Sequence, residues 1–162
     1  MDPELPIVIV PPNLLQRTWL GLRERSGGQS EAACVWIGDR EGQVSTTSDV
    51  LFPQDYGPVR AGALHHVSSR RAMNLLFEDL RRRGKQITAD IHTHPPGYPE
   101  LSEVDRAHPV EFRPGLLVMV VPDFARGAPL LSAVSAYLYV AGGRWRRLGR
   151  NETASAILVR DV

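Results

Sequence analysis

The sequence lacks most features that mark secreted, membrane-embedded and nucleic-acid-binding proteins. Among its 162 residues only Cys34 is a cysteine, which excludes an internal disulfide and is compatible with a reducing cytoplasm. No apolar run approaches the roughly 20 residues that a membrane-spanning helix needs, and the N-terminal segment has no signal-peptide pattern. The net charge of +1 gives no general reason to expect binding to nucleic acid or to an anionic membrane. We therefore expect a cytoplasmic protein that binds neither nucleic acid nor a membrane.

What is present is ordinary for a soluble globular protein, with 43% apolar and 23% charged residues. A chain of this length can bury a sizeable core without disulfides. The sequence contains no internal repeat, low-complexity segment or linker. We expect a single domain over residues 1–162.

The apolar pattern predicts alternating helices and strands. Helices are expected to begin at Asn13, at Ser68 and at Ser102. Strands are expected over 31–38, 43–52, 87–91, 116–121, 132–140 and 144–148, with a polar turn at 39–42 and a further strand at 156–160. The order α-β-β-α-β-α-β-β predicts an α/β (or α+β) domain with a mixed β-sheet flanked by helices.

Residues 53–66 fit neither period and are expected to form an irregular surface segment. The segment ends with His65 and His66, which could suggest a second metal site. Adjacent residues of an extended chain point to opposite faces, so they rarely bind one ion. We therefore interpret them as loop histidines or as part of an insertion that faces a substrate.

The stretch with the clearest chemistry covers residues 90–105, D-I-H-T-H-P-P-G-Y-P-E-L-S-E-V-D. His92 and His94 are two residues apart at the end of an apolar run, so a strand would point both imidazoles the same way. Pro95 and Pro96 then end the strand, because proline has no N–H to donate to a neighbouring strand.

Ser102 is a good helix N-cap, and Asp105 three residues later suits the first helical turn. The Asp105 carboxylate could then face the strand end that carries the histidines. Two imidazoles and one carboxylate leave the fourth tetrahedral position of zinc open for water, as in catalytic sites. Iron and manganese also accept such ligands.

A metal-dependent hydrolase also needs a carboxylate that is not a ligand, to accept a proton from water. Glu31 is the candidate, because it opens the apolar run E-A-A-C-V-W-I-G. On local grounds alone, the favoured interpretation of Glu31 is a solvated acid at a strand edge. Cys34 lies inside the same run and is expected to be buried and inert, which argues against thiol catalysis.

H-T-H-P, with seven residues between His94 and Ser102, then S-E-V-D and an upstream glutamate opening a strand that ends in glycine, resembles the JAMM (MPN+) zinc metalloproteases. The resemblance covers most of the chain and agrees with the expected element order. It implies that His92, His94 and Asp105 bind zinc, that Glu31 is the general acid/base, and that Ser102 helps to stabilise the tetrahedral intermediate.

The resemblance also implies a substrate: the amide bond that follows the C-terminal glycine of a ubiquitin-like protein, in a conjugate or a precursor. Compact prokaryotic relatives accompany ubiquitin-activating (E1-like) and conjugating (E2-like) enzymes in anti-phage operons, or trim sulfur-carrier proteins. The alternatives are a non-catalytic MPN-type scaffold, a DNA-repair-associated relative, and a zinc hydrolase of small amides. Intact ligand positions argue against the first, and the chain's length argues against the second.

Overall fold

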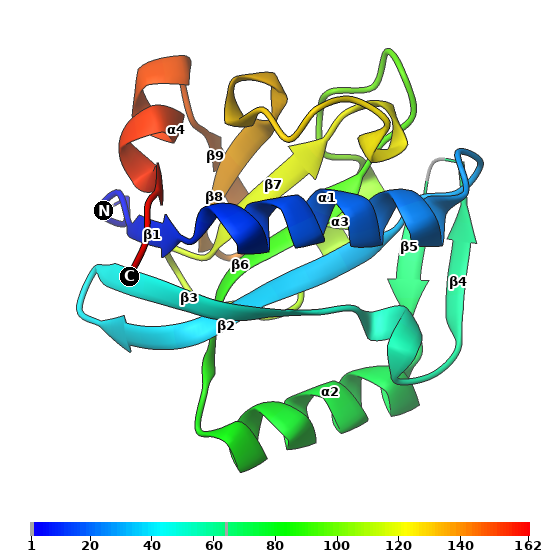
Figure 1. Cartoon of the computed structure of the whole chain (residues 1–162), viewed down its shortest axis with the longest axis horizontal. Helices are drawn as coiled ribbons and strands as arrows, with labels where there is room; N and C mark the ends of the chain where they lie inside the picture. The colour runs from blue at the N-terminus through cyan, green and yellow to red at the C-terminus, as the bar shows by residue number, and fades with distance from the viewer. Residues whose placement is uncertain (1, 64) are drawn as a thin grey trace.

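The computed structural model describes residues 2–63 and 65–162. They form a curled, mixed β-sheet with helices packed against it (Figure 1). Within these residues the sheet comprises β1 (Ile7–Val10), β2 (Ala33–Glu41), β3 (Val44–Leu51), β6 (Gln86–Thr93), β7 (Leu117–Val121), β8 (Ser135–Ala141), β9 (Arg144–Arg147) and β10 (Ile157–Val159). Their spatial order is β10-β1-β3-β2-β6-β7-β8-β9. The pairs β1/β10, β1/β3 and β6/β7 are parallel, and the others are antiparallel. The predicted α/β (α+β) fold with a mixed sheet is confirmed.

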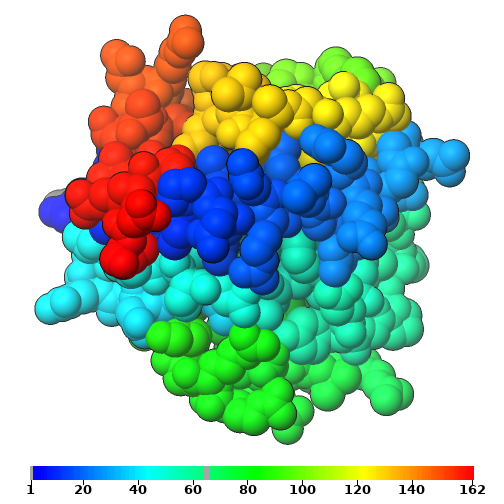
Figure 2. All heavy atoms as spheres, viewed as in Figure 1, coloured from blue at the N-terminus to red at the C-terminus, as the bar shows by residue number. Residues whose placement is uncertain are grey.

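Helices cover both faces of the sheet. They are α1 (Pro12–Ser26), α2 (Arg70–Arg83), α3 (Glu103–Ala107) and α4 (Arg150–Ala156). Apolar residues of α1 and α4 share one buried cluster with Trp36 and Ile91, whereas Leu76 and Leu80 of α2 belong to a second cluster. Figure 2 shows α1 running across one side of the molecule, with the C-terminal residues beside its start and α2 at the lower edge. The two clusters supply the hydrophobic stabilisation of the fold, at about 1.5–3 kcal/mol per large side chain.

Strand β6 lies at the centre of the sheet and sets which side chains face the site. Its pairing with β2 skips Thr88, because Ile37 pairs with Ile87 and Trp36 pairs with Ala89. Because of this bulge, Ile87 packs in the buried cluster that contains α2 residues, whereas Ala89, two residues later, packs in the cluster that contains α1 residues. The later even-numbered positions of β6 therefore point to the side of the sheet that carries α2.

The predicted irregular segment at 53–66 is instead ordered. A 3-10 turn, η1 (Pro53–Asp55), precedes a two-stranded hairpin of β4 (Val59–Gly62) and β5 (His65–Ser68). Leu64 and the side chain of His65 lie outside the described residues. The strands were missed because four residues are too few to show a clear alternation of apolar and polar side chains.

Several predicted boundaries were also wrong. Helix α1 has Pro11 as its N-cap and Pro12 at its first position, so Asn13 lies inside the helix. Ser69, not Ser68, caps α2, because its Oγ accepts a hydrogen bond from the N–H of Ala72 at 3.1 Å. Strand β2 extends to Glu41, which reduces the predicted turn at 39–42 to residues 42–43.

In the C-terminal segment one predicted element is confirmed, and one element was not predicted. The strand predicted at 156–160 is confirmed as β10, which pairs in parallel with β1. Helix α4 was not predicted, because only Thr153 and Ala156 in its seven residues are buried and no apolar stripe marks it. Its first turn is held by the Glu152 carboxylate, which accepts a hydrogen bond from the Gly149 N–H at 2.8 Å.

The side chains of β2 pack into the core. Cys34 is buried as expected, and burial raises the pKa of its thiol well above the usual value. Trp36 is buried in the core, and its indole N–H donates to Thr18 Oγ1 at 2.8 Å. Across the described residues, helices of the length and apolarity needed to span a membrane are absent.

Gly38 is required by a close approach of two backbones. A Cβ atom at this position would lie 1.9 Å from the carbonyl oxygen of Thr46, where the β2/β3 register shifts. Gly38→Ala is therefore expected to lower the free energy of unfolding by about 1–3 kcal/mol or more, measured by urea denaturation. Gly127→Ala is the control, because nothing lies within 4 Å of its Cβ position. Equal stability of the two variants would contradict this account.

Candidate metal centre

Three ligand atoms from two elements converge at the end of β6. His92 Nε2 and His94 Nε2 are 3.0 Å apart, His94 Nε2 and Asp105 Oδ2 are 3.0 Å apart, and His92 Nε2 and Asp105 Oδ2 are 3.3 Å apart. A tetrahedral ion with bonds of about 2.0–2.1 Å would hold neighbouring ligand atoms about 3.3 Å apart. The triangle therefore has the size of one face of a metal coordination tetrahedron, and the group is able to hold a metal ion.

The strand end that carries the histidines is fixed by backbone hydrogen bonds on both sides. Thr93 N–H donates to the Ala32 carbonyl at 2.9 Å, and Thr93 Oγ1 accepts from Ala32 N–H at 3.0 Å. His94 N–H donates to the carbonyl of Val121, the last residue of β7, at 2.9 Å. The backbone positions of both histidines are thus set by hydrogen bonds to the neighbouring strands of the sheet.

The loop after β6 fixes the tautomer of the neutral His94 ring. The ring Nδ1 lies 2.7 Å from the backbone carbonyl oxygen of Tyr98. Because a carbonyl can only accept, Nδ1 carries the proton, and Nε2 keeps its lone pair directed to the centre. No role was predicted for Tyr98, since a backbone carbonyl leaves no signal in residue type.

Asp105 is held by the start of α3. Its Oδ2 accepts from the Ser102 N–H at 2.7 Å, and the Ser102 Oγ accepts from the Asp105 N–H at 3.1 Å, which forms a capping box. Burial alone would raise the pKa of Asp105, but contacts with both imidazoles and the Ser102 N–H outweigh it and hold the pKa below the usual range. The carboxylate is therefore ionised and ready to bind a cation.

The Ser102 hydroxyl accepts the cap hydrogen bond and so keeps its own proton for another acceptor. The helix N-cap expected at Ser102 is confirmed by this geometry. Its O–H can donate to an anionic oxygen near the three ligand atoms.

Glu31 lies just before β2 and faces the same centre. Its Oε1 is 3.5 Å from His94 Nε2, its N–H donates to the Gly62 carbonyl at 2.7 Å, and only 1% of the residue is exposed. Its Oε2 is buried and has no hydrogen-bond partner within the described parts of the chain. Burial raises the pKa of Glu31 to about 7, with the two imidazoles opposing the shift. A buried, unsatisfied carboxylate of near-neutral pKa suits a group that exchanges a proton with water.

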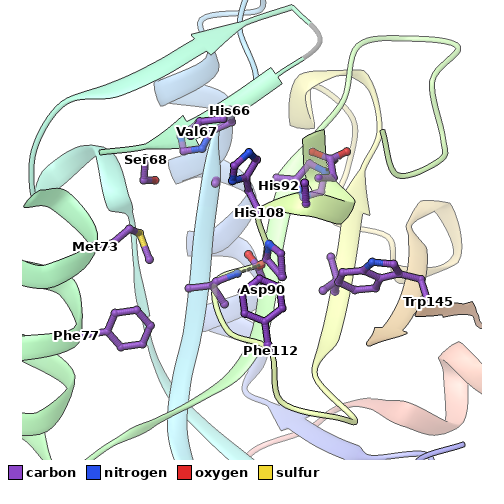
Figure 3. Close-up of a pocket in the computed structure, with 16 residues that line it drawn as sticks. His66, Val67, Ser68, Met73, Phe77, Asp90, His92, His108, Phe112 and Trp145 are labelled. Atoms are coloured by element: carbon purple, nitrogen blue, oxygen red, sulfur yellow. Dashed lines mark hydrogen bonds and ion pairs between the residues drawn. The ribbon is translucent and has the colours of Figure 1, made fainter. Parts of the chain in front are cut away.

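A cavity of about 260 Å³ adjoins the centre, between the sheet and α2 (Figure 3). Its lining includes His92 and Asp105, and also Asp90, His66 and His108. Asp90 Oδ2 accepts from the Val110 N–H at 3.1 Å, and burial raises the pKa of Asp90 to about 6. His108 is the C-cap of α3, and its backbone N–H donates to the carbonyls of Val104 and Asp105.

All five predicted site residues lie around this centre. Within residues 2–63 and 65–162, one group of three or more His, Cys, Asp or Glu side chains is suitable for a metal, and it is His92, His94 and Asp105. The second metal site weighed at His65 and His66 involves a side chain outside the described residues. Asp90 was missed, although its position two residues before His92 on the same strand would have placed it there.

Metal content tests the ligand set. We expect His94→Gln and Asp105→Asn to bind substoichiometric metal, because each removes one of three ligands. Glu31→Gln is expected to retain as much metal as the wild type, since its carboxylate is not part of the triangle. Atomic absorption of purified protein after dialysis measures this. Full metal content in Asp105→Asn, or loss of metal in Glu31→Gln, would contradict the assignment.

Comparison with known proteins agrees with this geometry. The chain is 30% identical over 140 residues to the Probable metalloprotease y4jG of Sinorhizobium fredii, covering 85% of this chain and 83% of that protein. A search against family models found no match.

Solved structures support the fold alone. The solution structure of protein DSY2949 from Desulfitobacterium hafniense aligns with a TM-score of 0.69 and 15% identity, over 96% of this chain and 94% of that one. The solution structure of a protein from Salinibacter ruber aligns with a TM-score of 0.60 and 12% identity, over 96% and 92%. With a metalloprotease relative at 30% identity and the JAMM motif residues gathered at one metal-binding centre, the chain belongs to the JAMM (MPN+) metalloprotease family and is a metal-dependent hydrolase.

Proposed function

We propose that this protein is a zinc metalloprotease that hydrolyses the amide bond after the C-terminal glycine of a ubiquitin-like protein. The observation that carries the proposal is the triangle of His92 Nε2, His94 Nε2 and Asp105 Oδ2 with the unsatisfied Glu31 carboxylate beside it. Two imidazoles and one carboxylate are the ligands of catalytic zinc sites that keep one position open. When bound, zinc supplies a Lewis acid that makes water nucleophilic at neutral pH and polarises the substrate carbonyl.

Glu31 supplies the proton transfer. Its buried carboxylate takes a proton from the attacking water and later delivers it to the leaving amine. The same residue can do both because a pKa of about 7 leaves the protonated and ionised forms close in free energy. The hydrogen bond of its N–H to Gly62 holds the residue in place during both transfers.

Ser102 would stabilise the developing oxyanion. Its Oγ is fixed by the cap hydrogen bond from Asp105 N–H, so the hydroxyl proton has few directions open to it. A fixed donor in a partly water-excluded site is worth far more to a transition state than a mobile one, because it needs no reorganisation.

Strand β5 offers a place for an extended substrate tail. It pairs with β4 on one side, no strand of the described residues pairs with its other edge, and it lines the cavity beside the metal centre. An extended peptide can add main-chain hydrogen bonds to such an edge. The C-terminal tail of a ubiquitin-like protein suits this geometry, in deconjugation or in precursor processing. E1-like and E2-like enzymes of a bacterial conjugation or anti-phage system are the partners that this proposal implies, in the cytoplasm.

Cleavage of a ubiquitin-like protein fused through its C-terminal glycine tests the proposal. Zinc-loaded wild type is expected to cleave the fusion, and zinc-loaded Glu31→Gln is expected to be at least about 100-fold slower, because general acid–base catalysis contributes about 10²–10⁴-fold. Gel densitometry over time measures the rates. Equal rates would eliminate Glu31 as the base, and inactivity of both loaded proteins would eliminate this substrate class.

Two variants separate the catalytic from the capping role of Ser102. Ser102→Ala removes both the hydroxyl and the cap, at a cost of about 1 kcal/mol of stability, whereas glycine at an N-cap costs only a few tenths. We expect both Ser102→Ala and Ser102→Gly to lower kcat by about 10²–10³, the usual effect of losing one oxyanion donor. Urea denaturation measured in parallel gives the stability. If the activity loss followed stability, so that only Ser102→Ala were slow, the hydroxyl would serve as a cap alone.

A further inference from the structure

The cavity beside the metal centre is lined by several side chains that have no role in the proposed reaction. Its floor comes from Ala33, Asp90 and Val118 of the three central strands. Its walls include the rings of Phe77 from α2, Phe112 from the segment before β7, and Trp145 from β9. Figure 3 shows Asp90 with Phe77 on one side of it and Trp145 on the other.

Asp90 is the one carboxylate of the lining that the metal centre does not engage. Asp105 contacts both histidines and the Ser102 N–H, whereas Asp90 accepts a single hydrogen bond, from Val110. Among the described residues no lysine or arginine lines the cavity or forms an ion pair with Asp90. Asp90 is partly buried, and the imidazole whose charge acts on it is that of His92, on the same strand. A carboxylate that loses part of its hydration without a lysine or arginine beside it carries a free-energy cost. A ligand that brings the cation would remove this cost.

The aromatic walls favour the same kind of ligand. Lysine and arginine side chains bind well between ring faces and a carboxylate, through cation–π and charge-assisted contacts. Phe112 is 63% exposed and packs edge-on against Tyr139 at 5.8 Å, so its ring stands at the rim of the cavity. The cavity volume of about 260 Å³ is below the range of about 300–1,000 Å³ for drug-sized ligands, so it suits one side chain.

The position of Asp90 indicates which residue of a substrate would carry the cationic side chain. Asp90 and His92 are two residues apart on one face of β6, which separates them by about 6–7 Å along the strand. An extended substrate advances about 3.3 Å per residue, so a side chain at Asp90 belongs to a residue one or two positions from the scissile amide.

We propose that this cavity is a specificity pocket for a lysine or arginine side chain of the substrate, adjacent to the scissile bond, with Asp90 as its counter-charge. The proposal rests on the proposed function in that a peptide-like substrate occupies the centre. It adds a sequence preference that the metal centre alone cannot provide.

Binding of two small probes tests the pocket without any cleavage. Nα-acetyl-lysine N-methylamide and its norleucine counterpart have similar length and differ mainly in the terminal ammonium. We expect the lysine probe to shift amide NMR signals of the cavity lining in the full chain and to bind at least about 10-fold more tightly than the norleucine probe, an amount typical of one cationic contact. Equal affinities, or shifts that map elsewhere, would overturn the proposal.

Variants identify the source of the preference. Asp90→Asn keeps an acceptor for the Val110 N–H and is expected to abolish the difference between the probes. Glu103→Gln is the matched control, because it removes an exposed acid of α3 that does not line the cavity, and it should preserve the difference. Phe112→Leu, at an exposed position, is expected to lower the affinity for the lysine probe more than the affinity for the norleucine probe.

A lysine preference that survives in Asp90→Asn would overturn the role of Asp90. Since neither probe contains a ubiquitin-like protein, failure of the cleavage assay and failure of this pocket are separate outcomes.

Discussion

One carboxylate oxygen, Oδ2 of Asp105, joins the two halves of the candidate site. It accepts from the Ser102 N–H and contacts both imidazoles, so a single atom links the start of α3 to the end of β6. The capping box and the ligand triangle therefore depend on each other. Hydrogen bonds of Thr93 and His94 hold the histidine backbone against Ala32 and Val121, so the sheet positions one half of the site and the start of α3 positions the other.

The chemistry of the site follows from burial as much as from residue type. Glu31 would be an ordinary acid at the surface, but enclosed between the hairpin and the metal centre its pKa rises to about 7. Asp105, with two imidazoles beside it, has its pKa lowered instead. Two carboxylates close to the same histidines thus differ in protonation, and this difference separates a ligand from a proton carrier.

Local rules of the sequence predicted the ligand side chains well. The spacing of His92 and His94 and the N-cap at Ser102 depend only on neighbouring residues, and the structure brings them together as expected. The approach of Glu31 depends on β2 pairing with β6, which only the family resemblance suggested. The hairpin at β4 and β5, helix α4 and the Tyr98 carbonyl were missed, because short elements and backbone groups leave little pattern in residue identity. Asp90 was also missed, although it lies two residues before His92 on the same strand.

The link between β6 and β7 buries few of its side chains. Helix α3 has no buried residue, and the segment around it contributes Leu101 and little else to the core. Segments with few buried apolar contacts open at the lowest free energies. A cation that bridges Asp105 to the two histidines would bind only while Asp105 lies beside them, and by mass action would stabilise that arrangement against local opening. Local stability of this segment and occupancy of the metal are therefore thermodynamically linked, and amide hydrogen exchange in residues 95–112 would report on the linkage.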